Sequence, residues 1–177
     1  MQINRRTLLA AGAGLASAAS LPAWAQLRIE ITGVGANQMP IAIPQFQGTN
    51  NAPLDLSAVV TADLERSGSF RALKVMGELP AEDMQNPRAQ FWRTMGATAL
   101  VMGAVEKLAD TRFSITYKLF GTAENKVIDE KQFVVSQGDL RLTAHRIADA
   151  VYERLTGETG IFASRLAYVL QRGPSAY

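Results

Sequence analysis

The 177-residue chain contains no cysteine and only one histidine. Without cysteine no disulfide can crosslink the fold, so the hydrophobic core has to stabilise it. Protein zinc sites are built mainly from cysteine and histidine ligands, and one histidine cannot supply them. We therefore predict no bound metal and no other cofactor. Hydrophobic residues make up 47% of the chain, a proportion typical of globular proteins.

The single histidine, His145, is the only side chain suited to general-base chemistry at neutral pH. It lies four residues before Asp149 on a predicted helix, so the two side chains can meet on one helical face. Catalysis would also require a nucleophile beside this pair, and the sequence has no Gly-x-Ser-x-Gly segment. We interpret His145 as a structural partner of Asp149 and predict that the chain has no catalytic residues and is not an enzyme.

Other candidate groups also have structural interpretations. The acidic pairs at 82–83 and 129–130 are read as solvated charge, because neighbouring side chains on a strand point to opposite faces and cannot share a ligand. Phe91 and Met95 lie four residues apart on a predicted helix. We interpret them as core contacts rather than as an aromatic ligand site.

The N-terminal residues resemble an export signal. Arg5 and Arg6 precede an apolar, small-residue-rich run at 7–21, and an Ala-x-Ala cleavage pattern follows at 23–25. The apolar run is too short to span a bilayer comfortably. We predict a signal peptide over residues 1–25, a mature chain that starts at Gln26, and a periplasmic location. The two arginines leave both the general secretory and the twin-arginine routes open.

Removal of this signal changes the charge balance. The whole chain has 18 Lys and Arg against 16 Asp and Glu, and the signal contains two of the arginines and no acid. The mature part is therefore formally neutral. A neutral chain without a basic run argues against nucleic-acid binding, and we predict no nucleic-acid partner and no direct membrane insertion.

Hydrophobic periodicity predicts a βαβαβββα order for the domain after the N-terminal segment. The fold class is α/β (α+β), with a mixed sheet and helices packed on it. The predicted strands are residues 41–43, 69–75, 98–105, 112–120 and 126–135, and the predicted helices are residues 55–67, 87–96 and 138–155.

The mature N-terminus is a candidate binding segment. Leu27, Ile29 and Ile31 alternate with polar residues, and Gly33 and Gly35 form a hinge after them. Such a strand can add to the edge of a partner's sheet, or it can be the first strand of its own domain. We predict that residues 26–35 form a mobile strand and hinge. The predicted partner-binding residues are Gln26, Leu27, Arg28, Ile29, Glu30, Ile31, Thr32 and Gly33.

The C-terminal part predicts the start of a second domain. The last helix runs into a turn bounded by Gly157 and Gly160, and residues 164–171 then alternate like a strand. A lone strand cannot satisfy its backbone hydrogen bonds or bury a face. We therefore predict an α/β domain over residues 36–160, and over residues 161–177 the first strand of a β-propeller whose other strands lie outside this sequence.

Several segments together resemble the TolB family of the Tol–Pal envelope system. The segments that carry the resemblance, in this order and spacing, are residues 41–46, 62–70, 101–103, 117–119 and 147–169. The resemblance implies a small domain that is similar in fold to anticodon-binding domains and is followed by a β-propeller. It implies an adaptor that links inner-membrane TolA to outer-membrane Pal and supports envelope integrity and cell division. In that family the segment matching Gln26–Gly33 binds the C-terminal domain of TolA, and the propeller binds Pal.

Two other interpretations stay open. One is an envelope-assembly adaptor of the curli-secretion type, although the chain lacks the cysteine that a lipoprotein of this kind would carry. The other is the non-catalytic domain of a propeller-fused periplasmic hydrolase.

Overall fold

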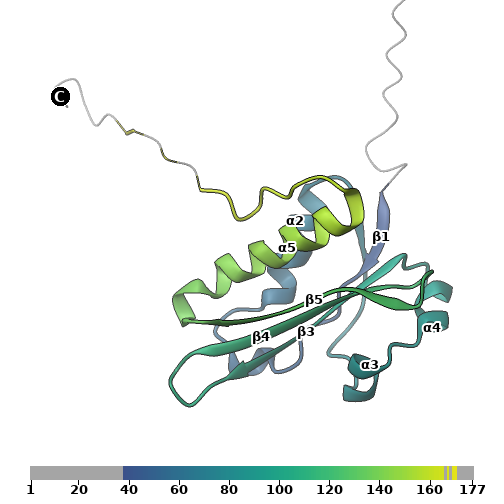
Figure 1. Ribbon diagram of the computed structural model, residues 1–177, viewed down its shortest axis with the longest axis horizontal. Coiled ribbons are helices and arrows are strands. Elements are labelled where there is room, and N and C mark those ends of the chain that lie inside the picture. Colours follow the sequence, from purple (N-terminus) through teal and green to yellow (C-terminus); the bar gives the residue numbers. More distant parts are fainter. Residues whose placement is uncertain (1–37, 166, 168, 171–177) are drawn as a thin grey trace, which may run out of the picture. The chain divides into compact units, whose positions relative to one another are not determined.

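The computed structural model describes residues 38–165, 167, 169 and 170 (Figure 1). The strands are β1 (Met39–Ala42), β2 (Phe70–Leu73), β3 (Ala99–Lys107), β4 (Phe113–Gly121) and β5 (Lys126–Val135). The α-helices are α2 (Leu56–Arg66), α3 (Ala81–Gln85), α4 (Ala89–Thr94) and α5 (Leu140–Thr156), and two 3₁₀ helices are η1 (Thr49–Asn51) and η2 (Gln137–Asp139). None of the helices in these residues is long and apolar enough to cross a membrane.

The strands form one mixed sheet in the order β2-β1-β3-β4-β5. Strand β1 pairs in parallel with both β2 and β3, whereas β3, β4 and β5 form an antiparallel meander. This arrangement confirms the predicted mixed sheet with packed helices. It also leaves β2 and β5 as the two edges of the sheet.

The helices cover both faces of the sheet. Figure 1 shows α2 and α5 on one face and α3 and α4 on the other. The face under α2 and α5 carries the larger buried cluster, which includes Leu56, Leu64, Tyr117, Ile147 and Val151. A smaller cluster of buried side chains lies on the other face of the sheet, under α3 and α4. The N-terminus of α2 is capped by Asp55, whose carboxylate accepts a hydrogen bond of 3.2 Å from the amide of Ala58.

The predicted element order is wrong by one helix, because α3 forms between the predicted strand at 69–75 and the predicted helix at 87–96. This five-residue helix is short and polar, so its own sequence gives little periodic signal. It is held by contacts with the rest of the fold. Asp83 is buried and accepts two hydrogen bonds of 3.0 Å from the guanidinium of Arg88, and Met84 packs against the smaller cluster. Reading Asp83 as solvated charge is therefore wrong.

The predicted core role of Phe91 and Met95 is also wrong, because the neighbouring Trp92 fills the core instead. Trp92 is 2% exposed, whereas Phe91 and Met95 are 45% and 43% exposed. The ring of Phe91 lies edge-on to that of Trp92 and has the Arg88 guanidinium 5.3 Å from its centre. Helix α4 thus presents Trp92 and Ala89 to the sheet and the Phe91–Met95 stripe to solvent.

The strand expected over residues 164–171 does not form in the part that the structure describes. Ser164, Arg165, Ala167, Val169 and Leu170 have no strand conformation, and the other residues of the segment lie outside the described residues. The domain boundary near residue 160 stays a prediction.

Candidate functional site

The predicted partner-binding segment, Gln26–Gly33, lies outside the described residues, together with the hinge glycines and the predicted signal peptide. The described chain begins at Gln38, directly before β1. At Met39 the backbone amide already donates to the carbonyl of Ser69, so β1 is paired from its first residue. Strand β1 has a neighbour on each side, so both of its pairings are made within the described residues.

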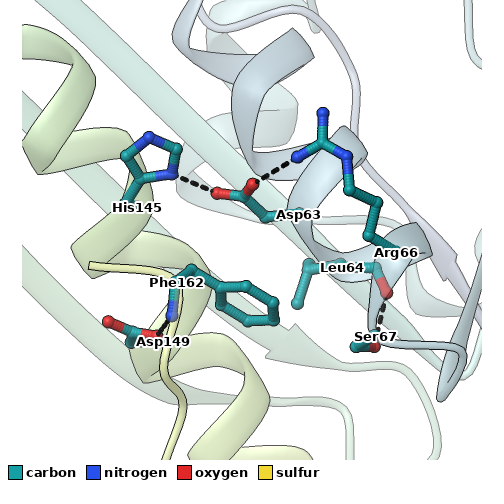
Figure 2. A network of polar contacts seen from close by, with 7 residues as sticks. All are labelled: Asp63, Leu64, Arg66, Ser67, His145, Asp149 and Phe162. Carbon is teal, nitrogen blue, oxygen red and sulfur yellow. Dashed lines mark hydrogen bonds and ion pairs between the residues drawn. The ribbon is translucent and has the colours of Figure 1, made fainter. Parts of the chain in front are cut away.

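The single histidine joins the two helices that cover the larger core. His145 on α5 lies with its Nδ1 2.5 Å from a carboxylate oxygen of Asp63 on α2 (Figure 2). Asp63 is buried and also accepts a hydrogen bond of 3.0 Å from the Arg66 guanidinium. The predicted pairing of His145 with Asp149 is therefore wrong. The histidine contributes instead to the contact between α2 and α5.

The surroundings of His145 are those of a structural contact. A shallow groove of about 300 Å³ lies beside it between the two helices, with Arg66 and Arg141 among its lining residues. The described residues that line this groove include no serine, threonine, cysteine or lysine. A histidine–carboxylate pair needs such a nucleophile to form a catalytic triad. This geometry favours a structural role for His145.

Asp149 contacts the segment that follows α5. Its carboxylate accepts hydrogen bonds of 2.7 Å and 3.0 Å from the amides of Phe162 and Ala163. Figure 2 shows the ring of Phe162 turned toward Leu64 of α2, and the same ring lies edge-on to Tyr152 at 5.8 Å. These contacts bring the chain back onto α5 as far as Ala163.

Replacing Asp149 with alanine is expected to release this returning segment while leaving the sheet intact. The amides of Phe162 and Ala163 lose their acceptor, so their hydrogen exchange should accelerate by about tenfold or more, which corresponds to losing roughly one hydrogen bond to a charged group. Proteolysis after Gly160 should accelerate as well. As a control, Glu153→Ala removes an exposed carboxylate from the same helix and should change neither rate. Unchanged exchange in the Asp149 variant would contradict this assignment.

A second buried polar group lies between the sheet and α5. The Tyr117 hydroxyl on β4 donates to Asp129 on β5, and the carboxylate is also 3.6 Å from Lys131 Nζ and 3.5 Å from an Arg154 guanidinium nitrogen. Burial, together with the adjacent carboxylate, raises the pKa of Tyr117, so its hydroxyl stays protonated as a donor. Glu130 points to the opposite face and pairs with Lys118, as strand alternation predicts. Reading Asp129 as solvated charge is wrong.

The described residues form no group of three histidine, aspartate or glutamate side chains that could hold a metal ion. Their buried side-chain nitrogen and oxygen atoms all have hydrogen-bond partners. The two buried networks are thus internally satisfied, and a ligand is not needed to complete them. What the described part offers to other molecules is its surface, in particular the two free edges of the sheet.

Comparisons with known proteins place the chain among proteins of one envelope system. A family model described as the TolB amino-terminal domain matches residues 27–128. The Tol-Pal system protein TolB of Polaromonas sp. strain JS666 is 45% identical over 94% of this chain, and that of Albidiferax ferrireducens is 44% identical over 84%. A crystal structure of TolB from Acinetobacter baumannii is similar in fold over 71% of this chain, with a TM-score of 0.60 and 28% identity.

The chain is shorter than these proteins. It spans 38% of the length of the Polaromonas relative and 35% of that from Albidiferax ferrireducens. It covers 30% of the Acinetobacter baumannii chain.

Proposed function

The chain belongs to the family of TolB amino-terminal domains, and from this premise we propose that it is a periplasmic adaptor of the Tol–Pal envelope system. The observation that carries the proposal is the family match itself, which begins at residue 27 and so includes the alternating segment before the hinge. Relatives that match 84–94% of this chain are named Tol-Pal system proteins. The proposed role is to link TolA and Pal in support of outer-membrane integrity and cell division.

In this proposal Gln26–Gly33 binds the C-terminal domain of TolA by adding a strand to the edge of its sheet. Backbone hydrogen bonds provide the affinity, and the apolar side chains of Leu27, Ile29 and Ile31 set the register. Pal is bound by a separate β-propeller and not by the α/β domain. The protein acts through binding and not through catalysis.

The described domain supports the proposal that TolA binds to Gln26–Gly33 and not to the α/β domain. Its strand β1 is paired on both sides, and its helices cover both faces of the sheet. Its buried polar side chains are satisfied within the described residues. A core built from the described residues supports the proposal that residues 26–33 serve a partner.

The periplasmic location is part of the proposal and has a direct test. Arg5 and Arg6, the apolar run and the Ala-x-Ala pattern predict cleavage before Gln26. Mass spectrometry of the protein recovered from the periplasmic fraction should find Gln26 at the N-terminus. An intact Met1, or residence in the cytoplasm, would contradict the proposed location.

The binding mode is tested by Ile29→Pro. Proline lacks a backbone N–H and interrupts the middle of a strand ladder, so calorimetry with the TolA C-terminal domain should show a loss of affinity of at least about tenfold. Ile29→Val is the matched control, because it keeps the backbone donor and the β-branched side chain. Equal affinities of the two variants would contradict binding by strand addition at this segment.

A further inference from the structure

The outer edge of β2, which pairs with no other strand among the described residues, lies beside a groove that the proposed function does not use. The groove has a volume of about 580 Å³ and runs between α2 and the strand. We propose that this β2–α2 groove binds an extended segment of a protein partner as an additional strand of the sheet. The site is separate from Gln26–Gly33, and the inference does not rest on the proposed function.

The backbone of β2 provides the hydrogen-bonding groups for such a strand. Successive residues of a strand direct their N–H and C=O groups to opposite sides. Ser69 accepts the amide of Met39, and in the parallel register Ile41 lies opposite Ala72, so Arg71 and Leu73 are the residues that bond to β1. The N–H and C=O of Ala72 therefore point outward to the groove. An occupant with a free extended backbone satisfies these groups, whereas a helix or a small apolar molecule does not.

Small side chains make room for this strand. Ala58, Thr61 and Ala62 line the groove on the α2 side, and Ala72 lines it on the β2 side. These small side chains leave space above the strand edge, which larger side chains at the same positions would fill. The alternate side chains of an added strand can enter this space, and small or medium apolar residues fit it best.

The charges of the groove narrow the class of partner. Its charged lining residues are Asp55, Glu65 and Lys74, which give a net charge of −1. The Asp55 carboxylate is already engaged as the cap of α2, whereas Glu65 is exposed at the other end of the helix. The groove therefore suits a neutral to basic segment, with a cation near Glu65, and disfavours an acidic one.

The test uses the mature chain and a defined probe. The probe is a capped peptide of about nine residues in which valine and alanine alternate with threonine between terminal lysines, a length that matches the strand edge and its flanks. At saturating peptide the amide of Ala72 should exchange about tenfold more slowly or better, whereas the amide of Arg71, which bonds to β1, should not change. A peptide with glutamate in place of the two lysines should bind about tenfold more weakly or worse.

Matched variants separate this site from other surfaces. Ala62→Trp fills the groove from α2 and should remove the protection of Ala72, whereas Ala81→Trp places the same side chain on exposed α3 and should keep it. Circular dichroism confirms that both variants fold.

Three outcomes would overturn the proposal. The first is no slowing at Ala72 with millimolar peptide. The second is protection that rises with the concentration of the chain alone, which would identify a second copy as the occupant. The third is protection without peptide that disappears when Gln26–Gly33 is deleted, which would identify the chain's own segment.

Discussion

Deletion of Gln26–Gly33 is expected to abolish binding to the C-terminal domain of TolA and to leave the free energy of unfolding of the domain within about 0.5 kcal/mol of its original value. The affinity should be lost because the deleted residues supply both the backbone ladder and the apolar side chains of the proposed contact. The stability should be kept because β1 pairs with β2 from Met39 onward and with β3 from Ile41 onward.

The size of the contact sets the expected affinity. A single added strand buries an area toward the low end for specific interfaces, near ~1,200 Å² in total, so binding should be modest and reversible. Calorimetry measures the affinity and urea titration measures the stability. A control variant with serine at Leu27, Ile29 and Ile31 keeps the chain length and removes only the apolar side chains. Full affinity after the deletion would place the binding surface elsewhere on the protein.

The largest stability effect is expected at Trp92. Its side chain is 2% exposed and lies in the smaller core cluster between α4 and the sheet. Replacing it with alanine removes the largest side chain of that cluster and leaves a cavity that the short helix cannot fill. The expected loss in the free energy of unfolding is about 3–5 kcal/mol.

The adjacent aromatic residue provides the matched control. Phe91 is 45% exposed, so Phe91→Ala should cost about 1 kcal/mol or less, chiefly through lost contacts with Trp92 and Arg88. Urea titration of both variants gives the comparison. Equal losses, or a larger loss for Phe91→Ala, would contradict the assignment of Trp92 to the core.

The long periodic elements could be predicted from the sequence. Residues 112–119 alternate between polar and apolar side chains, and residues 138–155 keep apolar side chains at helical spacing, so β4 and α5 match the predicted ranges to within a few residues. Strand β5 matches the predicted range 126–135 although its residues do not alternate. The sequences of the short helices predict much less about which side chains face the sheet. In the six residues of α4, either Phe91 or Trp92 could face the sheet, and only packing against Leu100 and Phe120 decides for Trp92.

The polar contacts were less predictable because their partners are distant in sequence. His145 has a possible local partner in Asp149, but it pairs with Asp63, which is 82 residues away on α2. Asp149 instead accepts the amides of the segment after α5. The burial of Asp129 was not predicted for the same reason, because its basic neighbour Arg154 lies on a different element. Pairings of this kind depend on how α2, α5 and the sheet pack, which periodicity does not specify.

Amide hydrogen exchange in the complex shows whether residues 26–33 bind TolA as an added strand. The mature chain, isotope-labelled, is mixed with the unlabelled C-terminal domain of TolA. We expect slowed exchange with a two-residue period between Leu27 and Thr32, because only alternate amides of an added strand face the partner. Uniform or absent protection in this segment, with protection appearing instead on the described domain, would contradict the claim.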